Sequence, residues 1–255
     1  MTTTRQNGSL YTNIQKKVAT IEFGHSASNS FPSELLDRLT KELIAVGNND
    51  EVAVIILKSE GKKAFCAGAS FDELVAISNL QEGKQFFSGF ANVLNAMRTC
   101  GKLIIGSVQG KAVGGGVGLA AACDYVFATE NAAVKLSEFT IGIGPFVIEP
   151  AVSRKIGISG TAELTLDATN WKNAYWAKEK GLYAKVFKTQ KELDAEVEIL
   201  ANKLASYNPM ALTEMKKVLW KGTEVWTSLL AERAAVSGEL VLSEFTKKAL
   251  EKFKK

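Results

Sequence analysis

The sequence predicts an α/β domain of mostly parallel strands, followed by a helical region. Across the first two-thirds of the 255 residues, short apolar runs alternate with segments of helical periodicity. This order is typical of a parallel sheet with helical crossovers. From about residue 149 onward the pattern becomes helical. Hydrophobic residues make up 46% of the chain, so a packed core is expected.

Strands are expected where apolar runs are bounded by turn residues. The run EVAVIILKSEG is apolar through its centre and ends in a glycine turn. A run of this kind indicates a strand that is buried on both faces. The expected strands are residues 17–23, 51–61, 102–108, 125–129, 133–136 and 181–187.

Helices are expected where apolar residues recur at intervals of three and four. The first such segment has Pro32 near its start, where proline is tolerated. Its helical spacing is carried by Leu35, Leu36, Leu39, Leu43 and Ile44. The expected helices are residues 31–47, about 83–98, 161–167, 171–181, 191–207, 209–222 and 227–253. The last ones are too regular to be a linker, so we expect them to pack on the core or on another subunit.

Composition excludes several classes of site. His25 is the single histidine and follows the first expected strand as a loop residue. A Ser-His-Asp triad or a zinc site would have to use it, and the sequence has no G-x-S-x-G motif. We therefore expect no metal. The net charge of +4 comes without a basic stripe, so no nucleic acid is expected. No apolar run approaches the roughly 20 residues of a membrane span, so no membrane is expected.

The cysteines and the chain ends bear on location. Cys66, Cys100 and Cys123 are scattered, which favours a reducing compartment without disulfides. The first 17 residues lack the apolar segment of a signal peptide, and the ending EKFKK does not contain a peroxisomal tripeptide. We expect a cytoplasmic protein, or one of another reducing compartment.

Two loops of very small residues follow expected strands. They are CAGAS, residues 66–70, and AVGGGVG, residues 112–118. In parallel α/β proteins such loops meet at the carboxyl ends of the strands, and small residues leave backbone N–H groups open to a ligand. Two converging N–H groups would form an oxyanion hole. Two alternatives stay open. The glycines could serve helix packing, or they could bind a dinucleotide, although G-x-G-x-G does not match that motif.

Glu138 follows the expected strand 133–136 and has apolar neighbours in the sequence. They are Leu136, Phe139, Ile141, Ile143 and Phe146. A carboxyl group in such surroundings loses hydration, which raises its pKa towards the range suited to a general base. The alternative is an exposed loop glutamate.

Three motifs together resemble the enoyl-CoA hydratase/isomerase (crotonase) superfamily. KAFCAGASFDEL is similar to the family's K-A-F-x-A-G-A-D-x-x-E-[LM] motif, and VQGKAVGGGVGLAAACDYVFA to V-x-G-x-A-x-G-G-G-x-E-L-A-x-x-C-D. KLSEFTIGIGP resembles P-E-x-x-L-G-x-x-P. The resemblance covers nearly the whole chain. It implies a crotonase-like spiral of β-β-α turns with a coenzyme A site over residues 1–200. It also implies C-terminal helices at 201–255 that build a homotrimer or a dimer of trimers.

The resemblance further implies an acyl-CoA thioester substrate. Coenzyme A would arrive as part of the substrate, with no permanently bound cofactor. The thioester oxygen would accept hydrogen bonds from the N–H groups of Ala69 and Gly115, and Glu138 would be the acid/base. The positions that match the family's coenzyme A contacts are Ser26, Ala27, Ser28, Ala67, Gly68, Ser70, Phe71 and Asp72. The acyl pocket is expected between the 71–98 region and residues 139–149.

The sequence departs from the family pattern at several positions. Gly118 stands where hydratases of the family have the first of two glutamates, and Ser70 stands where they have an aspartate. The missing glutamate and the Pro145–Phe146 pair are closer to Δ3,Δ2-enoyl-CoA isomerases, which work with one glutamate. Moving a double bond needs one base, whereas hydration must also activate a water. Glu149 is either an acid in the first turn of a helix or an auxiliary catalytic acid.

The expected function is double-bond isomerisation or hydration of an enoyl-CoA through an enolate. Two alternatives remain from the sequence. One is a decarboxylase or C–C lyase of the same superfamily. The other is a member that binds coenzyme A without catalysis.

Overall fold

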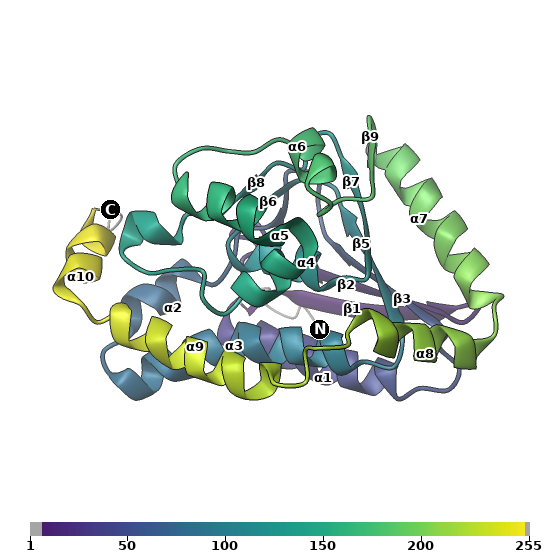
Figure 1. The fold of residues 1–255 in the computed structure, drawn as a ribbon, viewed down its shortest axis with the longest axis horizontal. Coiled ribbons are helices and arrows are strands. Elements are labelled where there is room, and N and C mark those ends of the chain that lie inside the picture. Colours follow the sequence, from purple (N-terminus) through teal and green to yellow (C-terminus); the bar gives the residue numbers. More distant parts are fainter. Residues whose placement is uncertain (1–6, 253–255) are drawn as a thin grey trace, which may run out of the picture.

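A computed structural model describes residues 7–252 as two sheets surrounded by helices (Figure 1). The larger sheet contains, in spatial order, β1 (Ser9–Gln15), β2 (Val18–Gly24), β3 (Val54–Ser59), β5 (Leu103–Val108), β7 (Tyr125–Thr129) and β9 (Lys185–Phe187). The smaller sheet contains β4 (Ala64–Cys66), β6 (Lys111–Val113) and β8 (Val134–Lys135). Pairing is parallel except between β1 and β2, as the apolar runs of the sequence predict.

The helices follow the strands in a regular alternation. They are α1 (Ser33–Gly47), α2 (Phe71–Ala76), α3 (Leu80–Thr99), α4 (Gly115–Ala122), the 3₁₀ turn η2 (Glu138–Ile141), α5 (Glu149–Leu166), α6 (Ala174–Glu179), α7 (Gln190–Ala205), α8 (Pro209–Leu219), α9 (Trp226–Leu240) and α10 (Glu244–Glu251). Within residues 7–252, no helix is long and apolar enough to cross a bilayer.

Successive turns of the chain form a spiral. β3 and β4, then β5 and β6, then β7 and β8, each give one strand to the larger sheet and the next to the smaller one. Helices return the chain to the larger sheet after each of the first two pairs. Because β4 and β6 are parallel neighbours, the loops that follow them emerge at the same edge. This is where the two loops of small residues meet.

The core lies on both faces of the larger sheet. Along β3, Ile55 and Leu57 face a cluster shared with α1, α3 and α4. The alternate residues Val54 and Ile56 face a second cluster formed with α7, which covers the other face (Figure 1). The strand is therefore buried on both sides, as its unbroken apolar run predicts.

The C-terminal helices pack on the core of their own chain. In α8, the ammonium of Lys216 lies 2.6 Å from a carboxylate oxygen of Asp124, and both side chains are almost fully buried. α9 runs along α3 (Figure 1). The two helices touch through glycines, because a Cβ on Gly83 would lie only 2.7 Å from the carbonyl oxygen of Gly238. The use of residues 201–255 in trimer formation stays a prediction.

Several short elements differ from the sequence prediction. β1 was not expected, because its residues SLYTNIQ mix polar and apolar types without a regular alternation, and most of them are not buried. β4 and β6 lie largely inside segments expected to be loops, since strands of three residues are too short to show a period. α2 lies in the 71–98 region expected to be helical, ahead of the helix predicted at about 83–98. The expected helix 227–253 is broken after Leu240, and Ser243 caps α10 by accepting from the N–H of Thr246. The predictions that rest on the chain ends fall partly on residues 1–6 and 253–255, outside the described residues.

Candidate active site

Backbone hydrogen bonds hold the 25–31 turn against the loop after β4. Phe31 pairs with Ala69 as an isolated parallel bridge. The Phe31 N–H donates to the Gly68 carbonyl at 2.8 Å, and the Phe31 carbonyl accepts from the Ser70 N–H at 2.8 Å. The Ala67 N–H donates to the Ser28 carbonyl at 3.2 Å. The two segments expected to contact coenzyme A therefore lie side by side.

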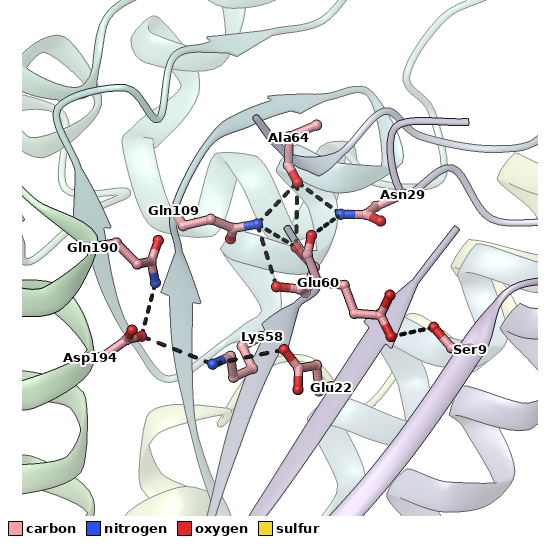
Figure 2. A network of polar contacts seen from close by, with 10 residues as sticks. Ser9, Glu22, Asn29, Lys58, Glu60, Ala64, Gln109, Gln190 and Asp194 are labelled. Atoms are coloured by element: carbon pink, nitrogen blue, oxygen red, sulfur yellow. Dashed lines mark hydrogen bonds and ion pairs between the residues drawn. The ribbon is translucent and has the colours of Figure 1, made fainter. Parts of the chain in front are cut away.

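Side-chain hydrogen bonds also connect the 25–31 turn to residues at the end of β3 and the start of β4 (Figure 2). Asn29 donates through Nδ2 to the carbonyls of Glu60 and Ala64, at 2.7 and 2.9 Å. Its Oδ1 accepts from the His25 N–H. Gln109 donates to the same Ala64 carbonyl at 3.0 Å. Asn29 has a positive φ of 57°, a conformation that asparagine tolerates better than most residues. This residue thus couples the 25–31 turn to the start of β4.

The backbone N–H groups of Ala69 and Gly115 take no part in the hydrogen bonds between the two segments. In the bridge, the neighbours of Ala69 make both hydrogen bonds to Phe31, so the Ala69 N–H faces the other way. Gly115 is the first residue of α4, and its N–H has no acceptor within the helix. Among residues 7–252, neither N–H has a hydrogen-bond partner. The two loops touch, because a Cβ on Gly68 would lie 3.6 Å from the Gly115 nitrogen.

Both N–H-bearing loops border one cavity of about 180 Å³. Its walls come from the loops after β4 and β6, from α2, α3 and η2, and from the segment before α5. The side chains that line it are Ala67, Ala69, Phe71, Leu74, Phe86, Phe87, Phe90, Val113, Ser137, Glu138, Ile141, Ile143, Pro145, Phe146, Val147, Ile148 and Ser237. Glu138 is the only ionisable residue among them. The walls match the expected regions 71–98 and 139–149, with Ser237 of α9 in addition.

Glu138 stands at the start of η2 and faces the glycine loop. A Cβ on Gly114 would lie 2.8 Å from its Oε1. Its Oε2 is buried and has no hydrogen-bond partner among the described residues. Burial raises the pKa of the Glu138 carboxyl from its ordinary value of 4.5 to about 7, against a smaller lowering by nearby backbone groups. The carboxyl is thus suited to take up and release a proton near neutral pH.

Comparisons with known proteins identify the family of the chain. The model of the enoyl-CoA hydratase/isomerase family matches residues 13–254. The chain belongs to the enoyl-CoA hydratase/isomerase family. It is 31% identical over 241 residues to a short-chain-enoyl-CoA hydratase of Clostridium acetobutylicum, covering 93% of this chain and 91% of the relative. It is 29% identical over 212 residues to a peroxisomal Δ(3,5)-Δ(2,4)-dienoyl-CoA isomerase of Arabidopsis thaliana, covering 77% and 74%.

The fold is also that of solved members of the enoyl-CoA hydratase/isomerase family. The structure of an enoyl-CoA hydratase from Bacillus halodurans superimposes with a TM-score of 0.87 at 23% identity, covering 95% of this chain and 99% of that one. The expected fold class is therefore confirmed, and so is the expectation of an enzyme of this family.

In this member of the enoyl-CoA hydratase/isomerase family, Ile148 occupies the space beside Gly118. A Cβ on Gly118 would lie 2.5 Å from Cγ2 of Ile148 and 2.7 Å from its Cβ. Ile148 is buried and lines the cavity. The position matched to the first glutamate of the hydratases is thus closed by an aliphatic side chain.

The remaining predicted residues lie around the site in different ways. Ser26, Ala27 and Ser28 form an exposed turn, and Asp72 is exposed in the first turn of α2. Ser70 caps α2 by accepting from the Glu73 N–H. None of these five lines the cavity.

Glu149 does not line the cavity either. It begins α5, where its carboxylate accepts a hydrogen bond from the Ser153 hydroxyl. This is the placement of an acid in the first turn of a helix.

Sequence reasoning named neither Asn29 nor Ser237 for the site, and it placed Phe90 and Ile148 only within the expected wall regions 71–98 and 139–149, without individual contacts. Phe90 belongs to the apolar stripe of α3, which predicts burial but not contact with the glycine loop. Asn29 sits in a polar loop segment, which signals a turn without identifying its partners. Ile148 and Ser237 reach the cavity only through tertiary packing, for which the sequence has no local pattern.

Proposed function

We propose that this enzyme isomerises the double bond of an enoyl-CoA thioester through an enolate. The supporting observation is a cavity with one carboxyl group, Glu138, and two unbonded N–H groups on adjoining loops. The aliphatic Ile148 beside Gly118 favours this reaction over hydration, because within residues 7–252 no second carboxyl group borders the cavity to activate a water.

In this mechanism the N–H groups of Ala69 and Gly115 bind the thioester oxygen. The Glu138 carboxylate removes a proton from C2 of a 3-enoyl-CoA, and the charge that develops on the oxygen is stabilised by the two donors. In the enolate, the electron pair of the C2–H bond has formed a C1–C2 double bond and the C1–O π pair has moved to the oxygen. When the carbonyl re-forms, the C1–C2 pair becomes the C2–C3 double bond, and the pair of the former C3–C4 double bond takes the proton from Glu138 at C4. The carboxylate is regenerated, and no other reactant is consumed.

Hydration is the second candidate, because a relative with 31% identity over most of its length is named a short-chain-enoyl-CoA hydratase. The two reactions are separated by assaying the purified protein with 3-hexenoyl-CoA and with crotonyl-CoA. We expect conversion of the first to its 2-enoyl isomer at a higher kcat/KM than hydration of the second. Glu138→Gln should lower the isomerase rate by about 10²–10⁴-fold. Faster hydration would replace isomerisation as the function, and an absence of turnover together with an absence of α-proton exchange in heavy water would refute both.

The assembly and the cofactor requirement belong to the same proposal. We propose that the enzyme assembles as a homotrimer or a dimer of trimers and needs no permanently bound cofactor, coenzyme A entering with the substrate. The family resemblance supports both statements. Light scattering of the purified protein, together with activity after exhaustive dialysis, tests them.

A further inference from the structure

The two proposed oxyanion donors lie on different turns of the spiral, so their spacing depends on what connects the two loops. Besides the pairing of β4 with β6 and the direct contact of Gly68 with Gly115, two buried aromatic rings link the loops. Phe31 comes from the turn before α1, and Phe90 comes from the middle of α3. Their ring centroids are 6.0 Å apart with an interplanar angle of 75°, an edge-to-face contact.

Phe31 is bound to the first donor loop through its backbone. Its N–H and carbonyl bond the residues on either side of Ala69, at 2.8 Å each. Its ring is fully buried. The position of Ala69 is therefore fixed relative to the Phe31 main chain, and through it to the Phe31 ring.

Phe90 is pressed against the second donor. A Cβ on Gly115 would lie 2.3 Å from Cζ of Phe90 and 2.4 and 2.7 Å from its two Cε atoms. The ring thus packs directly on the Gly115 backbone, in the space where the Cβ of a larger residue at position 115 would lie. Phe90 is 6% exposed and also lines the cavity.

We propose that Phe31 and Phe90 are positioning residues that set the separation of the Ala69 and Gly115 N–H groups. The inference rests on the proposed function, since it assigns the rings a role in the oxyanion hole. The rings themselves carry no charge and move no proton. They act through the two loops they touch, and a displacement of one donor by about 1 Å is enough to cost on the order of 10²-fold in rate.

The test uses Phe90→Leu and Phe31→Leu, each of which replaces one aromatic ring by a smaller aliphatic side chain without adding polarity. Phe23→Leu is the matched control. Phe23 is equally buried and lies 4.7 Å from the Phe31 ring, but its carbonyl bonds Glu60 rather than a donor loop. The first readout is the absorbance of the enolate of bound acetoacetyl-CoA, which reports the oxyanion hole without turnover. The second is kcat and KM for 3-hexenoyl-CoA, and butyryl-CoA affinity checks that each variant is folded.

We expect Phe90→Leu to weaken the bound enolate band and to lower kcat by roughly 10- to 100-fold, with KM and butyryl-CoA affinity changed by less than about threefold. The double variant should lose less than the product of the single losses, because the two rings act as one unit. Phe23→Leu should retain the band and the kcat.

Two outcomes would overturn the inference, and they are distinguishable from a failure of the proposed function. If Phe23→Leu and Phe90→Leu lose the enolate band and kcat equally, the rings contribute only general core packing. If the enolate band is unchanged in Phe90→Leu, Phe90 does not position the two donors. If the unaltered enzyme binds acetoacetyl-CoA without stabilising its enolate, the oxyanion hole itself is wrong and the role of the rings falls with it. Should Phe90→Leu not fold, Phe90→Met provides the same comparison with a flexible side chain of similar length.

Discussion

Ile148 packs so closely on Gly118 that it leaves no room for a side chain at position 118. A Cβ on Gly118 would fall 2.5 Å from Cγ2 of Ile148, which is buried at the start of α5. Gly118→Glu should therefore destabilise the protein by about 1–3 kcal/mol or more, through overpacking and an added buried carboxyl. Urea unfolding measures the loss, and a Gly118→Glu protein as stable as the parent would contradict the packing argument.

Making room should reverse part of that loss. Ile148→Ala removes Cγ2 and Cδ1 of Ile148 and leaves its Cβ, which would lie 2.7 Å from the new Cβ. Gly118→Glu with Ile148→Ala should therefore be more stable than the sum of the single changes predicts, although less stable than Ile148→Ala alone. The double variant also borders the cavity with a second carboxyl group. We expect its crotonyl-CoA hydration rate to rise relative to isomerisation, measured against Ile148→Ala alone.

The rate of the reaction should follow the protonation state of Glu138. The base must be ionised to remove a proton, and burial raises its pKa to about 7. The kcat/KM for a 3-enoyl-CoA should therefore rise with pH and level off above about pH 7. A profile that is flat between pH 5.5 and 8.5 would exclude Glu138 as the base in the free enzyme.

The same raised pKa predicts a pH-dependent effect on stability. Between its ordinary value of 4.5 and its folded value of about 7, Glu138 holds its proton more tightly in the folded state. This favourable contribution is complete below pH 4.5 and is lost as pH rises through 7. Glu138→Gln stays neutral at all these pH values. The free energy of unfolding of Glu138→Gln minus that of the parent should therefore increase by up to about 3 kcal/mol from pH 4.5 to pH 8. Denaturant unfolding at several pH values checks the slope, and a constant difference would contradict it.

Asn29 should matter for coenzyme A binding more than for chemistry. Asn29→Ala removes two hydrogen bonds to the carbonyls of Glu60 and Ala64 and strains a residue at positive φ. We expect a loss of about 1–3 kcal/mol in stability and an increase in KM for the acyl-CoA, with kcat changed less. Gln190→Ala removes only a hydrogen bond to Asp194, in a group of contacts that Figure 2 shows apart from those of Asn29, so it is the control and should leave KM unaltered.

The buried pair Asp124–Lys216 should anchor α8. Asp124 also accepts from the indole N–H of Trp220 and the backbone N–H of Ile104, at 2.6 and 2.7 Å. Lys216→Met would leave the carboxylate buried without its cation, which typically costs about 3–5 kcal/mol. The neighbouring Lys217→Met removes only an exposed pair with Glu214 and should cost less than about 1 kcal/mol. Equal thermal stability of the two variants would argue against the anchor.

The sequence predicts the parts of this protein that depend on local pattern. The unbroken apolar run of β3 correctly predicts a strand buried on both faces, and the apolar neighbours of Glu138 correctly predict a raised pKa. The small residues of the two loops predict their meeting, because parallel strands bring such loops to one edge.

The rest depends on contacts between segments far apart in the chain. Nothing near Gly118 indicates that Ile148 closes the space beside it, and nothing near Gly83 indicates that α9 lies against it. The strands β4 and β6 have three residues each, too few for a period of two to be distinguished from a loop. β1 is an edge strand with largely exposed polar residues, so the hydrophobic signal that marks the other long strands is weak there.

The two proposed donors are main-chain N–H groups of Ala69 and Gly115, which line the cavity and make no backbone hydrogen bond within residues 7–252. No single substitution can delete them as it would delete a catalytic side chain, except by altering the path of the backbone or introducing proline. In the proposed mechanism, the half of the site that polarises a carbonyl is thus resistant to mutation, whereas the half that moves protons resides in one replaceable carboxyl group. If that mechanism holds, a descendant of this enzyme could exchange its reaction by changing a few side chains around the cavity and would inherit the two backbone donors intact.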